Sequence, residues 1–363
     1  MTASMIPAAK PLIGDEERAA VDRVMRSGMI AQGPEVAAFE AEFAQELVGG
    51  PTCVAVSSGT AGLHLGLLAA GVGPGDEIIV PSFTFAATAN SVALTGATPV
   101  FADIDPETFC LEAGSVESAI TPRTVGIMPV HLYGHPADMT ALAALAARRG
   151  VQLFEDAAQA HGAAWQGSPV GSFGSFAMFS LYPTKNMTSG EGGMVACSTP
   201  EIARMVRLLR NQGMEKRYEN EVVGFNVRMT DVHAAIGRVQ LGKLPGWTAQ
   251  RQANAEFLSA NLEGVGVPTV APGATHVWHQ YTIRVSADRD AFAAALAAEH
   301  GVGSGVYYPI PNHELPSFGL SRDLPETARA CAEVLSLPVH PALTGEDLDR
   351  IVVGVNVVAK AGA

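Results

Sequence analysis

The stretch VGIMPVHLYGHPADMTALAALAARRGVQLFED, residues 125–156, carries the pattern that decides the fold. VGIMPV is a short β-prone run, DMTALAALAARRG has the Ala/Leu-rich pattern of a helix, and VQLFED is a second apolar run that ends in two carboxylates. The same alternation occurs earlier, in CVAV before TAGLHLGLLAAG, in EIIVPS before TFAATANSVALTG, and in PVFADI. This alternation predicts a mainly parallel α/β sheet covered by helices on both faces.

The pattern changes on either side of this region. Residues 13–48 contain two helix-like stretches with acidic first turns, separated by a Gly/Pro segment at 28–34. After about residue 245, HVWHQYTIRV alternates like an antiparallel strand, and GVYYPI resembles another strand. DAFAAALAAEHGV, ETARACAEVLS and EDLDRIVVGVNVVAKA predict helices. We therefore expect an N-terminal arm and a large α/β domain over residues 1–245, and a smaller α+β domain over 246–363.

The composition argues against several classes of protein. The net charge of −13 is spread along the chain without Lys/Arg clusters, which opposes binding to nucleic acid. No apolar run approaches the roughly 18 residues that span a bilayer, and the first 21 residues lack the pattern of a secretory signal. The four cysteines lie far apart without metal-ligand spacing, and we interpret them as reduced, mostly buried side chains. We expect a cytoplasmic protein without a metal site, a nucleic-acid partner or a membrane partner.

The first segment with candidate chemistry is VAVSSGTAGLHLGLLAAG, in which a strand runs through Ser58, Gly59 and Thr60 into a helix. Glycine permits close approach of the backbone, and free N–H groups at a helix N-terminus favour a bound phosphate. The same residues are also ordinary helix caps, so this segment alone leaves both interpretations open.

The second segment, VQLFEDAAQAHGA at residues 151–163, places Asp156 at the end of a buried strand. A buried carboxylate is costly unless it meets a cation, and a protonated pyridine nitrogen would be such a partner. A helix cap is the alternative interpretation. Gln159 is predicted to face the same side of the first helical turn, where it can hydrogen-bond a ring substituent. We interpret His161 as a packed histidine rather than a catalyst.

The third segment, FGSFAMFSLYPTKNMTSGEGGMVACS at residues 173–198, joins two β-prone runs through a loop that contains Lys185. A loop lysine is usually solvated, but this one is flanked by Pro183 and followed by a tight GEGG turn, which predicts a fixed backbone. Ser180 lies five residues earlier, at a strand end. A phosphate cradle, a strand-end carboxylate and a loop lysine in this order are the parts of a pyridoxal-phosphate site.

From about Ile6 to Val358 the sequence resembles the DegT/DnrJ/EryC1/StrS family of pyridoxal-phosphate-dependent sugar aminotransferases. The resemblance rests on ordered matches that include SGMIAQGPEVAAFEAEFA, SSGTAGLHLGL, DEIIVPSFTFAATANSV, EDAAQAHGA, SLYPTKNMTSGEGGM, GFNVRMTDVHAAIGRVQL and GVYYPIPNHELPSF. It implies the fold-type I, aspartate-aminotransferase-like architecture, with a mainly parallel mixed sheet between helices and a smaller C-terminal α+β domain. It also implies a cytoplasmic homodimer with active sites at the subunit interface.

The resemblance implies a role for each matching residue. Lys185 would form the Schiff base with pyridoxal phosphate and shuttle the proton between donor and cofactor, and Asp156 would pair with the pyridinium nitrogen. Phe83 would stack on the ring and Gln159 would lie near its 3-hydroxyl. Asn226 would reach the phosphate bound by the other protomer. Residues expected to hold the phosphate of the same protomer are Ser58, Gly59, Thr60 and Ser180.

The implied reaction moves an amino group from L-glutamate to a keto group of a nucleotide-linked deoxy-ketosugar. The segment NMTSGEGG is more similar to the form found in C4 aminotransferases than to the C3 form, so C4 is favoured over C3. Lys185 argues against the branch that carries histidine at this position and catalyses deoxygenation. A ketocyclitol aminotransferase, a related aminodehydratase and a non-catalytic regulatory protein are the alternatives. Candidate substrate contacts are Met29, Tyr182, Arg228 and Tyr308.

Two positions depart from the family pattern in segments expected to line the substrate pocket. Met29 stands where many relatives carry an aromatic residue, and Tyr307 where many carry histidine. The identity of the sugar therefore depends on features that the resemblance does not fix.

Overall fold

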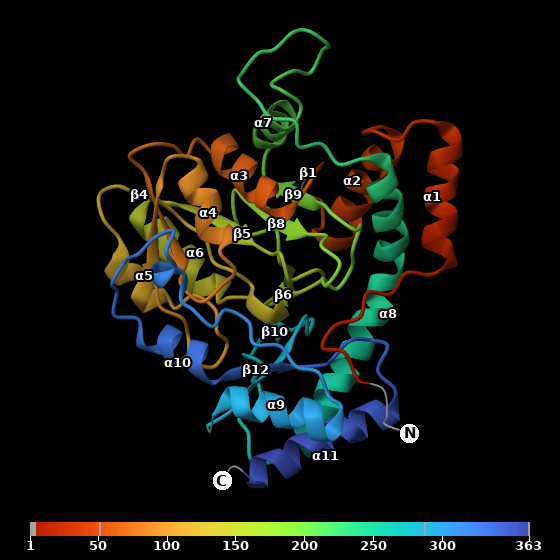
Figure 1. Ribbon diagram of the computed structural model, residues 1–363. Coiled ribbons are helices and arrows are strands. Elements are labelled where there is room, and N and C mark those ends of the chain that lie inside the picture. Colours follow the sequence, from red (N-terminus) through yellow and green to blue (C-terminus); the bar gives the residue numbers. More distant parts are fainter. Residues whose placement is uncertain (1–4, 51, 287, 362–363) are drawn as a thin grey trace.

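A seven-stranded sheet forms the centre of the large domain in the computed structural model, which describes residues 5–50, 52–286 and 288–361. Its strand order is β1-β9-β8-β5-β4-β2-β3, and only β9 runs antiparallel to its neighbours. The mainly parallel sheet expected from the alternating pattern is confirmed (Figure 1). The strands are β1 (Thr52–Val56), β2 (Glu77–Pro81), β3 (Thr98–Ala102), β4 (Thr124–Ile127), β5 (Gln152–Asp156), β8 (Phe176–Ser180) and β9 (Gly193–Cys197).

Helices cover both faces of this sheet, because each face presents apolar side chains. One apolar cluster joins the sheet to α3 (Gly59–Ala69), α4 (Ala87–Leu94) and α7 (Pro200–Arg210). On the opposite face, two clusters include side chains of α2 (Pro34–Leu47), α5 (Ala113–Ala119), α6 (Met139–Arg149) and α8 (Asp231–Asn261). The predicted N-terminal arm forms α1 (Asp15–Ser27) and α2, and α1 packs along α8. Short elements complete this part: β6 (Ala164–Trp165), β7 (Ser168–Pro169), β10 (Ala274–Thr275) and the 3₁₀ turn η1 (Leu132–Gly134).

Helix α3 lies unusually close to the sheet because glycine faces the strands. A Cβ atom at Gly66 would lie 2.5 Å from the Phe176 ring, and one at Gly59 would lie 3.0 Å from the Met178 sulfur. Larger side chains would lift the helix off β8. The glycines therefore hold the N-terminus of α3 against the carboxyl end of β8, where the site forms.

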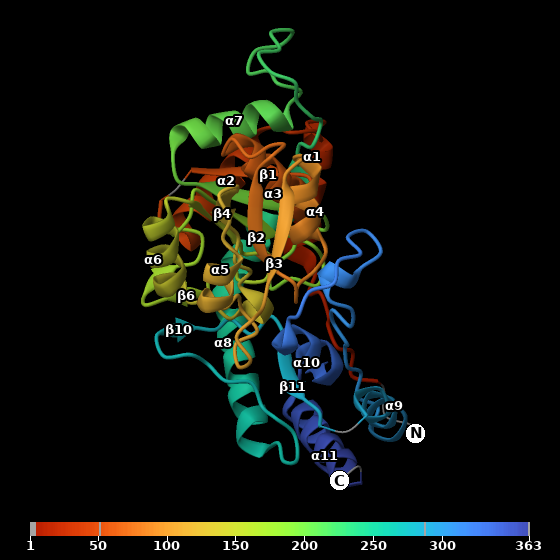
Figure 2. The same cartoon turned by 90° about the vertical axis from the view of Figure 1, so that its left-hand side faces the viewer.

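The smaller domain shares elements with the large one. Its sheet pairs β11 (Tyr281–Arg284) with β12 (Val334–Leu337), and α9 (Arg289–His300) and α11 (Gly345–Ala361) pack against it. The predicted boundary at residue 245 falls inside the continuous helix α8, which runs from the large sheet to α11 (Figure 1, Figure 2). Ile6 pairs with Val302 and lies in the small-domain core, so the first described residues belong with the C-terminal part.

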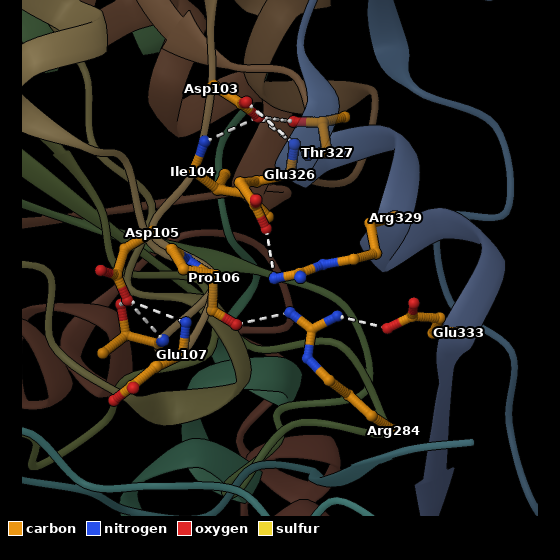
Figure 3. Close-up of polar contacts among 11 residues, drawn as sticks. Asp103, Ile104, Asp105, Pro106, Glu107, Arg284, Glu326, Thr327, Arg329 and Glu333 are labelled. Atoms are coloured by element: carbon orange, nitrogen blue, oxygen red, sulfur yellow. Dashed lines mark hydrogen bonds and ion pairs between the residues drawn. The ribbon is translucent and has the colours of Figure 1, made fainter. Parts of the chain in front are cut away.

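A second connection is made by residues 311–333, which return to the large domain. They include η2 (Asn312–Glu314) and α10 (Pro325–Glu333). The Asp103 carboxylate, which follows β3, accepts hydrogen bonds from the backbone N–H groups of Glu326 and Thr327 and so caps α10 (Figure 3). Arg284 of β11 pairs with Glu333 and donates to the backbone carbonyl of Pro106. These contacts therefore hold this part of the predicted small domain against the large domain.

Two elements predicted in the C-terminal part were wrong. GVYYPI, residues 305–310, is not a strand: Tyr308 has φ 58° and the next residue is proline, which ends any ladder. The helix expected over ETARACAEVLS stops at Glu333, because Val334 and the residues after it pair with β11 as β12. HVWHQYTIRV forms a strand only at Tyr281–Arg284.

Within residues 5–50, 52–286 and 288–361, no helix is both long and apolar enough to cross a membrane.

Candidate active site

A cavity of about 420 Å³ lies at the carboxyl ends of β1, β5 and β8, beside the start of α3. This edge is where ligands bind in open α/β sheets. Nine of the predicted site residues line it: Ser58, Gly59, Thr60, Asp156, Gln159, Ser180, Tyr182, Lys185 and Tyr308. The structure thus brings together four segments that lie up to 250 positions apart in the sequence, from Ser58 to Tyr308.

Asp156 ends β5 and is buried at the base of the cavity. Its carboxylate accepts hydrogen bonds from the Thr88 hydroxyl at 2.8 Å and from the Ala158 backbone N–H at 3.1 Å. Burial raises the pKa of Asp156, although both hydrogen bonds and the charge of Lys185 oppose this shift. The carboxylate is oriented and poorly solvated, so a cation placed against it would be strongly stabilised.

Glu155, the preceding residue, has a different task because successive side chains of a strand point to opposite faces. Its carboxylate accepts hydrogen bonds from the backbone N–H groups of Gly171 and Phe173, each at 2.8 Å, and lies 3.2 Å from His131 Nε2. His131 Nδ1 accepts a hydrogen bond from Ala137 N–H, so Nε2 carries the proton and donates to Glu155. Of the two carboxylates, only Asp156 faces the cavity.

Lys185 sits in a turn that is tied down on both sides. Its backbone N–H donates to the Tyr182 carbonyl at 3.0 Å, and the Asn186 side chain donates to the Val277 carbonyl at 2.9 Å. The Thr188 hydroxyl donates to the Leu181 carbonyl at 2.8 Å. Burial lowers the pKa of Lys185 to about 8, against the attraction of Asp156, so a neutral amine is accessible near physiological pH.

The N-terminus of α3 forms a third wall of the cavity. Ser58 is its N-cap and accepts a hydrogen bond from Ala61 N–H at 3.2 Å. The first N–H groups of a helix lack partners inside the helix, and here they belong to Gly59 and Thr60. Ser180 faces them from the end of β8. Backbone donors, a helix dipole and hydroxyl groups together suit a phosphate.

Gln159 fixes the aromatic wall of the cavity. Its side-chain oxygen accepts a hydrogen bond from Tyr133 N–H at 2.6 Å, and its side-chain nitrogen donates to the Tyr308 hydroxyl at 2.8 Å. Because the Tyr308 oxygen accepts this bond, the hydroxyl proton is available to a ligand in the cavity.

The cavity therefore combines a buried carboxylate, a helix N-terminus that suits a phosphate, and a lysine with a lowered pKa. Comparison with known proteins gives the same picture. The family model described as the DegT/DnrJ/EryC1/StrS aminotransferase family matches residues 11–356. The chain belongs to this family.

Individual relatives cover nearly the whole of this aminotransferase. It is 43% identical to dTDP-3-amino-3,4,6-trideoxy-alpha-D-glucose transaminase of Streptomyces venezuelae over 345 residues, covering 93% of this chain and 90% of the relative. The crystal structure of S. venezuelae DesV in complex with a ketimine intermediate superposes with a TM-score of 0.92 at 41% identity, covering 98% and 99% of the two chains. The structure of NtdA from Bacillus subtilis with bound cofactor PMP gives a TM-score of 0.91 at 32% identity, covering 99% and 86%. These matches confirm the fold-type I architecture.

The prediction that Phe83 faces the cofactor ring needs correction in this aminotransferase. Phe83 is fully buried and packs edge-on against Tyr308, behind the cavity wall. Phe85, which is 64% exposed, lines the cavity instead. The chain bends after β2, so the two phenylalanines of SFTF do not share a face as they would in a regular strand.

Three further predicted contacts lie outside the cavity of their own chain. Met29 is exposed in the turn between α1 and α2. Arg228 donates to the Asn211 side chain at 2.9 Å. Asn226 is exposed in the segment between α7 and α8, which projects from the body at the top of Figure 1. None of these three residues therefore lines the cavity of its own chain. Asn226 is exposed, so its side chain is accessible to a second molecule.

Several cavity residues were missed by the sequence analysis. Thr88 orients Asp156, and His279 lies 3.2 Å from the Asn186 side-chain oxygen beside the lysine turn. Thr88 sits in a helical pattern in which a threonine has no distinctive signal, and His279 comes from a different domain. Other lining residues not predicted are Thr84, Thr184, Glu191 and Gln280.

Proposed function

We propose that the chain is a pyridoxal-phosphate-dependent aminotransferase that moves an amino group from L-glutamate to a keto group of a nucleotide-linked deoxysugar. The observation that carries this proposal is the placement of Lys185, Asp156 and the N-terminus of α3 around one cavity. Each of the three suits a different part of the cofactor: aldehyde, ring nitrogen and phosphate.

The residues present fit the cofactor. Asp156 would hold the protonated ring nitrogen, and Thr88 and Ala158 would keep its carboxylate in place through their hydrogen bonds. Gly59 and Thr60 would bind the phosphate, with Ser58 and Ser180 beside them. Phe85, which lines the cavity, takes the stacking position that the sequence analysis gave to Phe83.

When bound, pyridoxal phosphate supplies an electron sink for negative charge at the donor's α-carbon. The chain supplies the acid–base chemistry. The Lys185 amine would accept the proton from the α-carbon of glutamate onto Nζ, and in the second half of the reaction Nζ would donate a proton to the sugar carbon that receives the nitrogen. Its lowered pKa favours this role, because a base must be free of its proton before it can accept another.

The proposed substrate class is supported by the family and by the hydroxyl groups that line the cavity. The relative from S. venezuelae is named for an amino group at position 3, whereas the NMTSGEGG segment of this chain favours position 4. Tyr182 and Tyr308 line the cavity with hydroxyl groups that can hydrogen-bond a sugar. We retain position 4 as the proposed site of amination, with position 3 as the competing outcome of the assay.

A homodimer is part of the proposal. A groove of about 390 Å³ between α1 and α8 has the apolar side chains of Ile13, Val21, Met25 and Ile236 in its lining, beside the charged residues Glu17, Arg18 and Asp22. Its apolar part suits burial against a second copy. Asn226, which is exposed and pairs with Asn211 at the end of α7, would then contact the phosphate in the partner's cavity.

The experiment incubates the cofactor-loaded protein and L-glutamate with three acceptors: a 4-keto and a 3-keto deoxysugar nucleotide, and a keto-inositol. Mass spectrometry detects amine transfer and NMR locates the new nitrogen. We expect amination of the 4-keto nucleotide sugar and none by Lys185→Ala. Amination of the keto-inositol alone would replace the proposal with a cyclitol aminotransferase, and failure with all three acceptors would contradict the proposed reaction.

A further inference from the structure

Arg251 of α8 is a buried cation outside the cofactor-holding set. Its side chain is 7% exposed. One terminal nitrogen donates to the backbone carbonyl of Trp278 at 3.1 Å and, more weakly, to that of His279 at 3.4 Å. Within the described residues its Nε, also buried, has no hydrogen-bond partner. A guanidinium with neutral partners and an unused donor is incompletely satisfied.

The surroundings of Arg251 do not balance its charge. Burial lowers the pKa of Arg251 to about 10. His279 and His340 both line the adjoining space. Burial, with a smaller contribution from the charge of Arg251, lowers the pKa of each, so both are neutral near pH 7. Buried charges are costly unless they are paired. An anion is the kind of group that would balance this charge.

A small chamber of about 20 Å³ lies beside Arg251 and adjoins the active site. Its walls include Arg251, Ala8, Ala9 and His340. Thr184, His279, Gln280 and Tyr307 line both this chamber and the main cavity. A separate narrow space is lined by both Arg251 and Lys185. The guanidinium therefore lies close behind the lysine turn, and its chamber borders the main cavity.

We propose that Arg251 and this chamber form the subsite for the distal carboxylate of a dicarboxylic amino donor. The proposal rests on the proposed aminotransferase function and adds the residue that selects the donor. The donor's α-carboxylate is bonded to the reacting carbon and must stay beside Lys185 in the main cavity. A chamber of this size excludes the diphosphate of a nucleotide sugar, so the ligand group that suits it is a single small anion such as one carboxylate.

The interaction has a defined chemistry. A carboxylate in the chamber would accept charge-assisted hydrogen bonds from the free donors of Arg251, which are stronger than those between neutral groups. It would also neutralise the buried cation. Donors with two carboxylates would therefore be preferred over donors of the same length with one.

The test measures binding of two non-reactive probes to the cofactor-loaded enzyme by calorimetry: glutarate, with two carboxylates, and pentanoate, with one. The native enzyme should bind glutarate more tightly. Arg251→Gln should weaken the binding of glutarate roughly tenfold to a hundredfold and leave the binding of pentanoate unchanged. Arg251→Lys, which keeps the charge, should lose less than Arg251→Gln.

A second variant separates the subsite from a structural role of Arg251. Ala9→Leu fills the chamber without touching the bonds from Arg251 to Trp278 and His279, and it should weaken glutarate selectively. Unchanged glutarate binding in both Arg251→Gln and Ala9→Leu, or equal losses for the two probes, would overturn the proposal. Failure of the aminotransferase function would appear differently, as absence of amine transfer in the native enzyme from any donor.

Discussion

Lys185 and Asp156 share a buried site in which each charged form is disfavoured by desolvation. Their mutual attraction offsets this only in part, since the pKa of Asp156 stays raised and that of Lys185 stays lowered. The pair therefore lowers the folding stability of the protein without cofactor. Bound cofactor would relieve it by giving the carboxylate a cation and the amine a covalent partner.

Replacing Lys185 with Met should make the stability of the apoprotein depend differently on pH. The native pKa of about 8 lies below the ordinary 10.5, so between these values the unfolded chain binds more protons than the folded one. Stability of the native protein therefore rises with pH across this window, and below pH 8 it carries the full cost, roughly 3 kcal/mol.

Urea unfolding of the two apoproteins from pH 7 to 10.5 measures this difference. We expect the advantage of Lys185→Met to be largest at pH 7 and to shrink as the pH rises through 8 to 10.5. A difference that does not vary with pH would mean that the folded protein does not perturb this amine.

Phe85 and Phe83 provide a matched pair of substitutions. Phe85→Ala removes an exposed ring from the cavity, so stability should change by less than about 0.5 kcal/mol while cofactor affinity falls roughly tenfold. Phe83→Ala empties a fully buried position and should cost about 3–5 kcal/mol. Thermal unfolding and cofactor titration check both. Loss of cofactor affinity in Phe83→Ala alone would restore the original assignment.

Helix α3 can serve the site only because glycine lets it lie against β8. Gly66→Ala would place a methyl group 2.5 Å from the Phe176 ring, and the resulting shift should cost about 1–3 kcal/mol. Gly242 of α8 is the control, since a Cβ there meets nothing within 4 Å. Gly242→Ala should stabilise by about 0.5–1 kcal/mol. Urea unfolding measures both; equal effects would contradict the close packing of α3.

The elements that sequence predicted well are those whose signal is local. The alternating strands and helices around residues 125–156, and the helices on either side of residues 28–34, depend on periodicity within each segment. GVYYPI failed because its apolar pattern says nothing about the left-handed φ of Tyr308. The strand β12 was missed because pairing with β11, not helix propensity, decides the state of Val334.

The site residues divide in the same way, into those marked by local sequence and those placed by tertiary packing. Asp156 and Lys185 were identified from strand-end and turn signals, and the structure places both in the cavity. Thr88 and His279 reach the site through tertiary packing, so nothing in their own segments marks them. The choice between Phe83 and Phe85 depended on a bend after β2 that the sequence does not specify.

At the scale of the whole molecule, the proposed dimer places two incomplete sites together. A hybrid experiment tests it: Lys185→Ala and Asn226→Ala homodimers are mixed, dissociated and reassociated. Each parent should be impaired, and the mixture should recover roughly a quarter of native activity, because half of the dimers are hybrid and each has one intact site. No recovery, with exchange confirmed by mass spectrometry, would place Asn226 in the site of its own chain or outside both.

The most direct test of the central claim is to find which lysine holds the cofactor. The cofactor-loaded protein is reduced with borohydride, digested, and the peptides that carry the pyridoxyl group are identified by mass spectrometry. The account predicts modification at Lys185. Modification at Lys10, Lys216, Lys243 or Lys360 with Lys185 unmodified, or no stable adduct, would contradict it.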